Sequence, residues 1–389
     1  MRIIMTGGGS GGHITPILAV AQAVKRLDST TEVLYIGQTG DGLADIPAQD
    51  TNIDAVYSVR AGKFRRYHGE GWRQFLDIPT MFLNLRDGLY VLIGCVQSYR
   101  LLRRLRPDII FVKGGFVGVP VGLAAASLKI PYVTHDSDAI PGLANRIIGR
   151  WARRHAVALP AELYPYPGAK TSTVGIPLVG DFVPVTNALQ KSYRSEIQIP
   201  SAAKVLFVIG GGLGAQRINQ AISEIASHLL AEFPGLYLIH GVGRANEAAV
   251  NTVYDDHLSG TARQRVQVRG YISDLYRYSG AADVVITRAG ATNLAEFSVQ
   301  GKACIVVPSP FLTGGHQLKN AQFLADAGAA VVVDEAAVQA DANYLARAIS
   351  DLLKNPVRAA ELGQKLQTTA HRDAARKMAQ LLLDEAAVK

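Results

Sequence analysis

Short apolar runs alternate with longer amphipathic segments along most of the chain. The apolar runs are rich in Val, Ile and Leu and lack polar alternation, which is typical of parallel strands covered by helices on both faces. We therefore expect an α/β fold built on doubly wound parallel sheets. In the first half, the expected strands are 2–5, 32–36, 55–59, 109–112, 132–134 and 155–159, and the expected helices include 14–27, 117–128 and 141–152. In the second half, the expected strands lie near 204–209, 236–240, 265–269, 283–287, 303–307 and 329–333.

Both halves open on the same pattern, in which a strand runs into a glycine-rich loop and then a helix. The first loop is Thr6-Gly7-Gly8-Gly9-Ser10-Gly11-Gly12-His13, and the second is Gly210-Gly211-Gly212-Leu213-Gly214. Glycine lets the backbone approach a ligand closely, and the free N–H groups at the helix start favour an anion. No acidic residue closes the second strand, which disfavours a dinucleotide site. A phosphate or sugar cradle is the favoured interpretation, with a plain tight turn as the alternative.

The length of 389 residues and the repeated opening predict two domains of similar size. We place the first domain at 1–177 and the second at 178–370, because a segment with Pro and Gly joins them. The tail from residue 341 has the pattern of nearly continuous helix interrupted at Pro356. Its last part, about 371–389, is expected to pack back on the first domain.

The net charge of +8 indicates an anionic partner. Charge alone does not decide whether this partner is nucleic acid, acidic lipid or a phosphorylated substrate. Residues 63–106 combine basic residues with a strongly apolar run, which predicts one or two amphipathic surface helices. Arg86-Asp87 would fall in mid-span and argues against a transmembrane helix. A membrane-surface patch and a core helix with a solvated basic face both remain open. The basic residues accompany an apolar face rather than interleaved stacking aromatics, which disfavours nucleic acid.

The cysteines and the start of the chain bear on the compartment. Cys95 and Cys304 lie in separate apolar runs, so we expect reduced, buried thiols in a cytoplasmic protein. The N-terminal apolar stretch is too short for a signal peptide, and no cleavage region follows it.

The segment from Thr287 to Glu296 is the strongest ligand-binding candidate in the second half. A strand ends at Thr287, a glycine turn follows, and a helix begins near Ala291, so its first N–H groups can face a diphosphate. The carboxylate of Glu296 can accept hydrogen bonds from both hydroxyls of a ribose. Alternatively, Glu296 is a first-turn residue favoured by the helix dipole.

Other patterns are weaker evidence for a ligand-binding or catalytic site. His316 and Gln317 follow a polar turn and can bind sugar hydroxyls or simply cap the helix that carries Asn320. His135-Asp136-Ser137-Asp138 is a polar turn at a strand end, favoured over a metal site. The sequence contains no serine-nucleophile elbow, Walker loop, C-x-x-C pair or H-E-x-x-H motif.

Six motifs, in order along the chain, resemble the MurG family of cell-wall glycosyltransferases, which belongs to glycosyltransferase family 28. They are the segments 6–13, 114–120, 135–145, 210–215, 288–296 and 316–320. The resemblance implies a GT-B fold, with two Rossmann-like domains facing across a cleft. It also implies inverting transfer of N-acetylglucosamine from UDP-N-acetylglucosamine to the C4 hydroxyl of the muramyl sugar of lipid I, an undecaprenyl-diphosphate-linked muramyl-peptide, which forms lipid II.

The resemblance implies residue roles as well. Glu296 would hold the ribose, Ala291, Thr292 and Gly212 would line the diphosphate, and His316 with Gln317 would contact the sugar. His13 is the candidate general base, and Asp138 is the alternative. The other implied substrate-binding residues are Ser10, Gly11, Gly12, Gly115, Asn145, Gly211, Ile272, Arg288, Asn293 and Asn320.

The implied partners are the donor, the polyprenyl-diphosphate acceptor, an anionic membrane surface and other cell-wall synthesis proteins. The resemblance implies that the protein binds peripherally to the cytoplasmic face of the cell membrane. It also implies no cofactor and no metal bound by protein ligands. Residues 63–106 would then receive the lipid-linked acceptor.

Two positions depart from the family pattern. Val179 stands where the family has an arginine near the donor diphosphate, and Asp138 stands where it has an asparagine. Arg288 or Arg217 is our hypothesis for the missing positive charge. The alternatives that these departures support are a transferase with another UDP-hexose or another lipid acceptor, and a catalytically silent nucleotide-sugar-binding protein.

Overall fold

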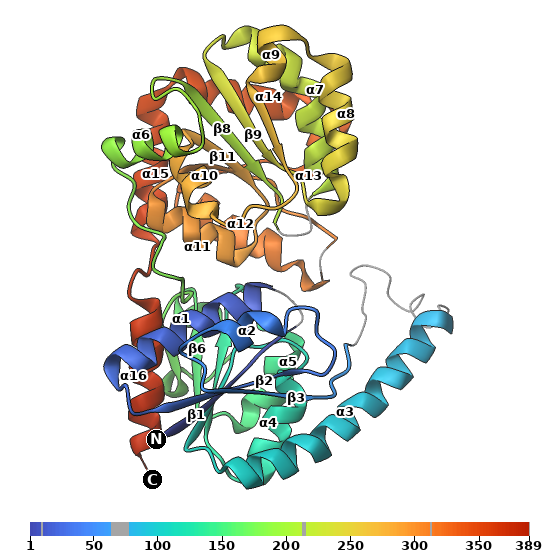
Figure 1. The fold of residues 1–389 in the computed structure, drawn as a ribbon, viewed down its shortest axis with the longest axis vertical. Helices are drawn as coiled ribbons and strands as arrows, with labels where there is room; N and C mark the ends of the chain where they lie inside the picture. The colour runs from blue at the N-terminus through green and yellow to red at the C-terminus, as the bar shows by residue number, and fades with distance from the viewer. Residues whose placement is uncertain (9–10, 64–77, 212–214, 312, 389) are drawn as a thin grey trace. The chain divides into compact units, whose positions relative to one another are not determined.

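The computed structural model describes residues 1–8, 11–63, 78–211, 215–311 and 313–388. The chain forms two compact units, which are described separately (Figure 1). Unit 1 is Met1–Gly180 together with His371–Lys389, and unit 2 is Asp181–Ala370. The chain therefore leaves unit 1, builds all of unit 2 and returns.

Unit 1 contains a seven-stranded, wholly parallel sheet in the order β3-β2-β1-β4-β5-β6-β7. Its strands are β1 (Arg2–Thr6), β2 (Glu32–Gln38), β3 (Ala55–Val59), β4 (Ile109–Val112), β5 (Tyr132–Asp136), β6 (Arg154–Val157) and β7 (Thr171–Thr173). The central strands are apolar and buried, as a sheet covered on both faces requires. The strand β7 was not expected, because its Thr-Ser-Thr sequence lacks an apolar run.

Helices cover both faces of this sheet. They are α1 (Gly11–Leu27), α2 (Asp45–Gln49), α3 (Ile78–Leu105), α4 (Gly118–Ser127), α5 (Leu143–Ile148) and α16 (Ala374–Ala387). The C-terminal helix α16 lies beside α1 (Figure 1) and contributes Met378 and Leu382 to the core formed with β1 and β4. Glu385 at its end accepts from Arg153 and Arg154, each at 2.6 Å.

Unit 2 contains a six-stranded parallel sheet in the order β10-β9-β8-β11-β12-β13. Its strands are β8 (Lys204–Ile209), β9 (Leu236–Gly241), β10 (Val266–Arg269), β11 (Val284–Thr287), β12 (Ala303–Val306) and β13 (Val331–Val332). Its helices are α6 (Asn187–Glu196), α7 (Gln216–Glu232), α8 (Glu247–His257), α9 (Gly260–Gln264), α10 (Leu275–Ala281), α11 (Ala291–Gln300), α12 (His316–Asp326), α13 (Glu335–Ala340), α14 (Asn343–Lys354) and α15 (Pro356–Thr368).

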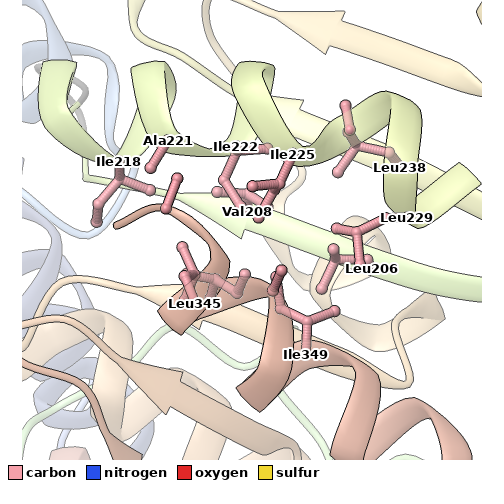
Figure 2. Close-up of a cluster of buried hydrophobic side chains, with 14 of the residues drawn as sticks. Leu206, Val208, Ile218, Ala221, Ile222, Ile225, Leu229, Leu238, Leu345 and Ile349 are labelled. Atoms are coloured by element: carbon pink, nitrogen blue, oxygen red, sulfur yellow. The ribbon is translucent and has the colours of Figure 1, made fainter. Parts of the chain in front are cut away.

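The core on one face of this second sheet follows the helical period. Ile218, Ile222, Ile225 and Leu229 of α7 recur every three or four residues and point toward the sheet (Figure 2). They meet β8 and β9 together with side chains of α14, and all are nearly inaccessible to solvent. The period predicted for a helix after the second glycine loop is thus the period that builds the core.

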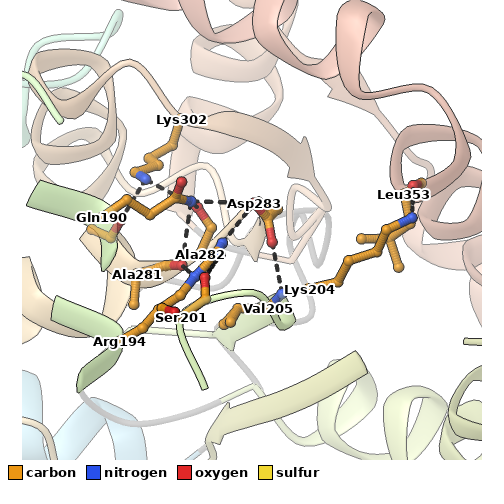
Figure 3. A network of polar contacts seen from close by, with 11 residues as sticks. Gln190, Arg194, Ser201, Lys204, Val205, Ala281, Ala282, Asp283, Lys302 and Leu353 are labelled. Atoms are coloured by element: carbon orange, nitrogen blue, oxygen red, sulfur yellow. Dashed lines mark hydrogen bonds and ion pairs between the residues drawn. The ribbon is translucent and has the colours of Figure 1, made fainter. Parts of the chain in front are cut away.

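A polar network closes the amino ends of the strands in unit 2 (Figure 3). Asp283 accepts from Arg194 at 2.7 Å and from the Val205 N–H at 2.7 Å, which ties α6 to the sheet. The Lys302 ammonium donates to the Gly280 and Ala282 carbonyls at 2.7 and 3.0 Å. Burial lowers the pKa of Lys302 to about 7. These buried cations have partners, so the network fixes the sheet end opposite the glycine loop.

Several expectations need correction. The tail has a second break, at residues 369–373, before α16, so it is less continuous than expected. Both cysteines are free, but Cys95 is only partly buried, because it lies on α3 near the surface. The apolar part of 63–106 is one helix, α3, while 64–77 lie outside the described residues. Among the described residues, no helix is long and apolar enough to cross a membrane.

Candidate functional site

The chain order reverses between β1 and β4 in unit 1, and in open parallel sheets the carboxyl ends of the strands at such a reversal are the usual place for a ligand. The strands end level, with Thr6 opposite Val112. Gly115 has φ +79°, and a Cβ there would lie 2.8 Å from the Gly8 carbonyl oxygen. A side chain at Gly115 would therefore be both strained and in collision. The two loops pack backbone to backbone because both are glycine at the contact.

His13 lies in the first turn of α1, where Gly11 and Gly12 begin the helix; Ser10 falls outside the described residues. Its Nε2 is 3.7 Å from the Cβ position of Gly115, which places the imidazole against the second loop. Burial, with a smaller contribution from Lys113, lowers the pKa of His13 to about 4. The imidazole is therefore neutral near pH 7 and can accept a proton.

Asn145 is a buried residue that holds the end of β5. Its Nδ2 donates to the His135 carbonyl and to Asp136 Oδ1, both at 2.9 Å. Its Oδ1 is buried and has no hydrogen-bond partner among the described residues. Asn145 thus has one role in the fold and one acceptor left for a ligand.

Lys113 and Asp138 add charge to the same edge of the sheet. Lys113 is 3% exposed, and its ammonium donates to Ser137 Oγ at 2.7 Å. Burial lowers the pKa of Lys113 to about 8, against the opposing effect of the Asp136 and Asp138 charges. Asp138 is therefore within electrostatic reach of a buried cation, which offsets the negative charge that it brings to a site for phosphate.

Unit 2 has its own reversal of chain order, between β8 and β11, where Ile209 lies opposite Thr287. The second glycine loop and the 288–290 turn follow these strands. Gly211 has φ +95°, which a residue with a side chain rarely adopts. Gly212 lies outside the described residues. Two predicted donor segments thus follow the carboxyl ends of two neighbouring strands.

The N-terminus of α11 is open for an anion. The N-cap residue is Gly290, in an extended conformation, and it has no side chain that could accept from the first N–H groups of the helix. No acidic residue lies in the first turn. Ala291, Thr292 and Asn293 are the first three residues of the helix. Their N–H groups have no partner within the helix, so they can donate to a diphosphate.

Glu296 is the sixth residue of α11, so it lies beyond the first turn, and the helix-dipole interpretation is wrong. The residue is 7% exposed, and its Oε2 has no hydrogen-bond partner among the described residues. Burial raises the pKa of Glu296 to about 8. A buried carboxyl group without a donor is costly, and hydroxyl groups of a ligand would supply the missing hydrogen bonds.

The remaining predicted donor residues support loops around the same edge. Gln317 Oε1 accepts from the Ser309 N–H at 2.9 Å, and Asn320 Nδ2 donates to the Ala289 carbonyl at 3.0 Å. His316 begins α12 and is partly exposed. Ile272 follows β10, and its Cδ1 lies 3.5 Å from the Cβ position of Gly241.

Arg288 has an ion-pair partner that the sequence did not suggest. It donates to Glu335 and, at 3.1 Å, to the Val307 carbonyl. Arg217 Nη1 also donates to Glu335, at 3.0 Å, and its guanidinium lies 4.3 Å from the Phe311 ring centre. The Arg217 side chain is 37% exposed and that of Arg288 only 12%. Of the two, Arg217 is the more accessible cation.

Sequence comparison assigns both units to one family. Residues 3–157 match the N-terminal domain of glycosyltransferase family 28, and residues 205–378 match its C-terminal domain. The chain belongs to glycosyltransferase family 28. The family assignment makes it a glycosyltransferase, and the two parallel-sheet units are the two domains of the GT-B fold.

Curated members of family 28 resemble the chain over most of its length. A protein of Desulforudis audaxviator (strain MP104C) is 35% identical over 86% of this chain and 85% of its own. A protein of Geobacter metallireducens is 30% identical over 99% of this chain and 98% of its own. Both are named UDP-N-acetylglucosamine--N-acetylmuramyl-(pentapeptide) pyrophosphoryl-undecaprenol N-acetylglucosamine transferase.

Solved structures agree on the fold. The crystal structure of Acinetobacter baumannii MurG has a TM-score of 0.72, with 24% identity, and the match covers 98% of this chain and 99% of that one. A UDP-N-acetylglucosamine 2-epimerase from Neisseria meningitidis has the same general fold, with a TM-score of 0.66, at 14% identity and 99% coverage of this chain. At these sequence identities the structural similarity shows the fold and does not show the reaction.

Proposed function

We propose that this family 28 enzyme transfers N-acetylglucosamine from UDP-N-acetylglucosamine to the C4 hydroxyl of the muramyl sugar of lipid I, with inversion at the anomeric carbon, to form lipid II. The observation that carries the proposal is that α11 has both an N-terminus without a side-chain cap and the buried Glu296, whose Oε2 has no hydrogen-bond partner among the described residues. A nucleoside diphosphate offers an anion to the helix N-terminus and vicinal hydroxyls to the carboxyl group. The names of the curated relatives support the sugar and the acceptor.

In the donor site, the N–H groups of Ala291, Thr292 and Asn293 hold the diphosphate, with Gly211 and Gly212 allowing close approach. Glu296 binds the ribose hydroxyls. Both arginines donate to Glu335, and we assign the compensating cation to Arg217 because its side chain is 37% exposed and that of Arg288 is only 12% exposed.

Other parts of the donor contact loop residues. His316, Gln317 and Asn320 lie at the start of α12, where the sugar hydroxyls bind. Ile272, in the loop after β10, contacts the nucleobase. The helix N-terminus stabilises the charge that develops on the leaving UDP.

In the acceptor site, the neutral His13 imidazole takes the proton of the C4 hydroxyl. The oxygen forms a bond to the anomeric carbon from the face opposite UDP, while the bond to the β-phosphate oxygen breaks and its electron pair leaves with UDP. Gly12, Gly115 and Asn145 line the approach, and Asp138 is the alternative base. General-base catalysis of this kind contributes roughly 10²–10⁴-fold to the rate.

The face of α3 supports peripheral binding to a membrane. Leu85, Leu89, Leu92 and Val96 recur at helical spacing and are 52–66% exposed. Arg100, Arg103 and Arg104 follow at the end of the helix and are exposed. An apolar stripe beside cations fits the anionic cytoplasmic face of a membrane, where the polyprenyl acceptor resides.

The test is product analysis after incubation with UDP-N-acetylglucosamine and a soluble lipid I analogue. We expect one disaccharide product with a β linkage to C4, identified by mass spectrometry and by NMR coupling constants. His13→Gln should lower kcat by about 10²-fold or more without changing UDP affinity. Retention of the anomeric configuration, or a product at another hydroxyl, would refute the proposed reaction.

A further inference from the structure

Glu335 is a buried acidic residue to which the proposed reaction has so far assigned no role. It is the first residue of α13, in the segment that follows β13, and it is 2% exposed. A carboxyl group is rarely buried so completely unless it has partners. Its partners are two arginines: Oε1 accepts from Arg288, and Oε2 accepts from Arg217 Nη1 at 3.0 Å. The buried carboxylate therefore joins two cations that lie far apart in the sequence.

The partners of Glu335 come from the segments after neighbouring strands. Arg217 is the second residue of α7, which follows β8 and the second glycine loop. Arg288 follows β11 directly, and it also donates to the carbonyl of Val307, the residue after β12, at 3.1 Å. Because β8, β11, β12 and β13 are adjacent in the sheet, one carboxylate ties together the carboxyl ends of four consecutive strands.

This cluster has a surplus positive charge, and Arg217 presents it. Two arginines face one carboxylate, so the three side chains carry a net positive charge. The Arg217 side chain is 37% exposed, whereas that of Arg288 is 12% exposed. Among the described residues, Glu335 is the one hydrogen-bond partner of the Arg217 guanidinium. A guanidinium has several N–H donors in a fixed fork, so Arg217 can bind an anion while Glu335 holds it.

An aromatic ring contacts the same guanidinium. Phe311 lies in the segment between β12 and His316, and its ring centre is 4.3 Å from Arg217 Cζ. A cation over an aromatic face is attracted by the charge distribution of the ring. Phe311 is 62% exposed, so this contact lies at the surface of unit 2. Arg217 thus links the helix after the second glycine loop to the segment that leads to the predicted sugar contacts.

A long arginine side chain has many conformers, and ordering it before a ligand arrives lowers the entropic cost of binding. We propose that Glu335 is a positioning residue that holds the Arg217 guanidinium at the carboxyl ends of β8 and β11, where it binds the donor diphosphate. The inference rests on the proposed function, in which Arg217 supplies the cation for the diphosphate. It has the consequence that a negatively charged residue strengthens the binding of an anion.

The test compares nucleotide binding by the full-length wild-type protein, Glu335→Gln, Arg217→Gln and the double variant. UDP affinity is measured by calorimetry, and uridine affinity by NMR titration. If Glu335 acted only through its charge, Glu335→Gln would bind UDP more tightly, because a repelling carboxylate is removed. We expect the opposite, a loss of UDP affinity of about three- to tenfold with the uridine affinity unchanged.

The double variant shows whether Glu335 acts through Arg217. In the Arg217→Gln background, the further change Glu335→Gln should leave the UDP affinity nearly unchanged. Glu232→Gln removes an ion-pair partner of Lys354 at the other end of α7, and this matched control should bind UDP as the wild type does. An equal loss of affinity in both backgrounds, or tighter UDP binding by Glu335→Gln, would overturn the proposal.

A second variant covers the case in which Glu335→Gln does not fold. Arg217→Lys keeps the charge at this partly exposed position but lacks the planar fork that can contact Glu335 and a phosphate together. It should therefore bind UDP almost as weakly as Arg217→Gln does. Wild-type UDP affinity in Arg217→Lys would overturn the proposal, because a charge without the fork would then suffice.

The inference and the proposed function fail in different ways. If Arg217→Gln binds UDP as tightly as the wild type, Arg217 is not the cation for the diphosphate, and the role of Glu335 is wrong. Acceptor-dependent transfer by the wild-type protein tests the proposed function without either variant. If that transfer is absent while UDP binds and the two residues are coupled as expected, the reaction is wrong and the role of Glu335 stands.

Discussion

At the scale of single residues, the clearest signal is the buried carboxyl group of Glu296. Burial raises its pKa to about 8, so in the ligand-free protein it is mostly protonated near pH 7. Ribose hydroxyls that donate to the carboxylate favour its ionised form, so binding of UDP should release a proton.

Calorimetry of UDP binding in buffers of different ionisation enthalpy measures this proton release. We expect a fraction of a proton to be released at pH 7 and the Kd to fall as the pH rises toward 8. Glu296→Gln should bind UDP more weakly and release none. A binding enthalpy that is the same in all buffers would contradict the assignment.

The same residue sets a pH dependence of stability. Because the folded-state pKa is raised from 4.5 to about 8, the contribution of Glu296 is favourable below about pH 4.5 and is lost as the pH rises through 8. Glu296→Gln has no carboxyl group to ionise, so this loss of stability should not occur in the variant. In urea unfolding without ligand, the free energy of unfolding of the variant should rise relative to that of the wild type by up to a few kcal/mol between pH 5 and pH 8. A constant difference across this range would show that the group is ionised when buried.

At the scale of elements, the exposed stripe of α3 predicts membrane binding. Leu92→Glu places a charge in a stripe residue that is 65% exposed, and Val357→Glu is a matched control on α15 at 66% exposure. Sedimentation with vesicles that contain anionic phospholipid should fall several-fold for the first variant and not for the second. Equal binding by both would remove α3 from the membrane-binding surface.

Elements defined by buried apolar runs could be predicted from the sequence. Strands 109–112 and 204–209 have the expected bounds, because their buried apolar runs are typical of parallel strands in a covered sheet. Strand 55–59 also has the expected bounds, although it contains Ser58 and only Val59 is buried. The edge strand Thr171–Thr173 was missed, because its residues are polar and its backbone pairing alone defines it. The expected strand at 329–333 is only Val331–Val332, because the edge position pairs with a single neighbour.

At the scale of the whole molecule, unit 1 depends on the end of the chain. Leu382 of α16 is fully buried in the core that includes β1 and β4. Leu382→Ala should destabilise unit 1 by about 2–5 kcal/mol, while UDP binding by unit 2 keeps its affinity. Chemical unfolding followed with and without UDP separates the two effects. A parallel loss of UDP affinity would show that the units are not independent in stability.

The candidate site was predictable only where several residues form a pattern. The glycine loops and the 288–296 segment are readable because a strand, a turn and a helix occur in order. Glu335 and Lys113 were missed as site residues, because each is a single charged residue whose meaning depends on which strands are neighbours. Lys113 did leave one signal, a charge immediately after four apolar residues, and the strand order β1-β4-β5 is needed to interpret it.

The measurement that tests the central claim most directly is the initial rate of UDP release by the purified protein. It should be made with UDP-N-acetylglucosamine, UDP-glucose and UDP-galactose, each with and without a soluble lipid I analogue. We predict release that requires the acceptor and is fast only with UDP-N-acetylglucosamine. Release with another donor at the same rate, or no release from a folded protein that binds UDP, would contradict the account.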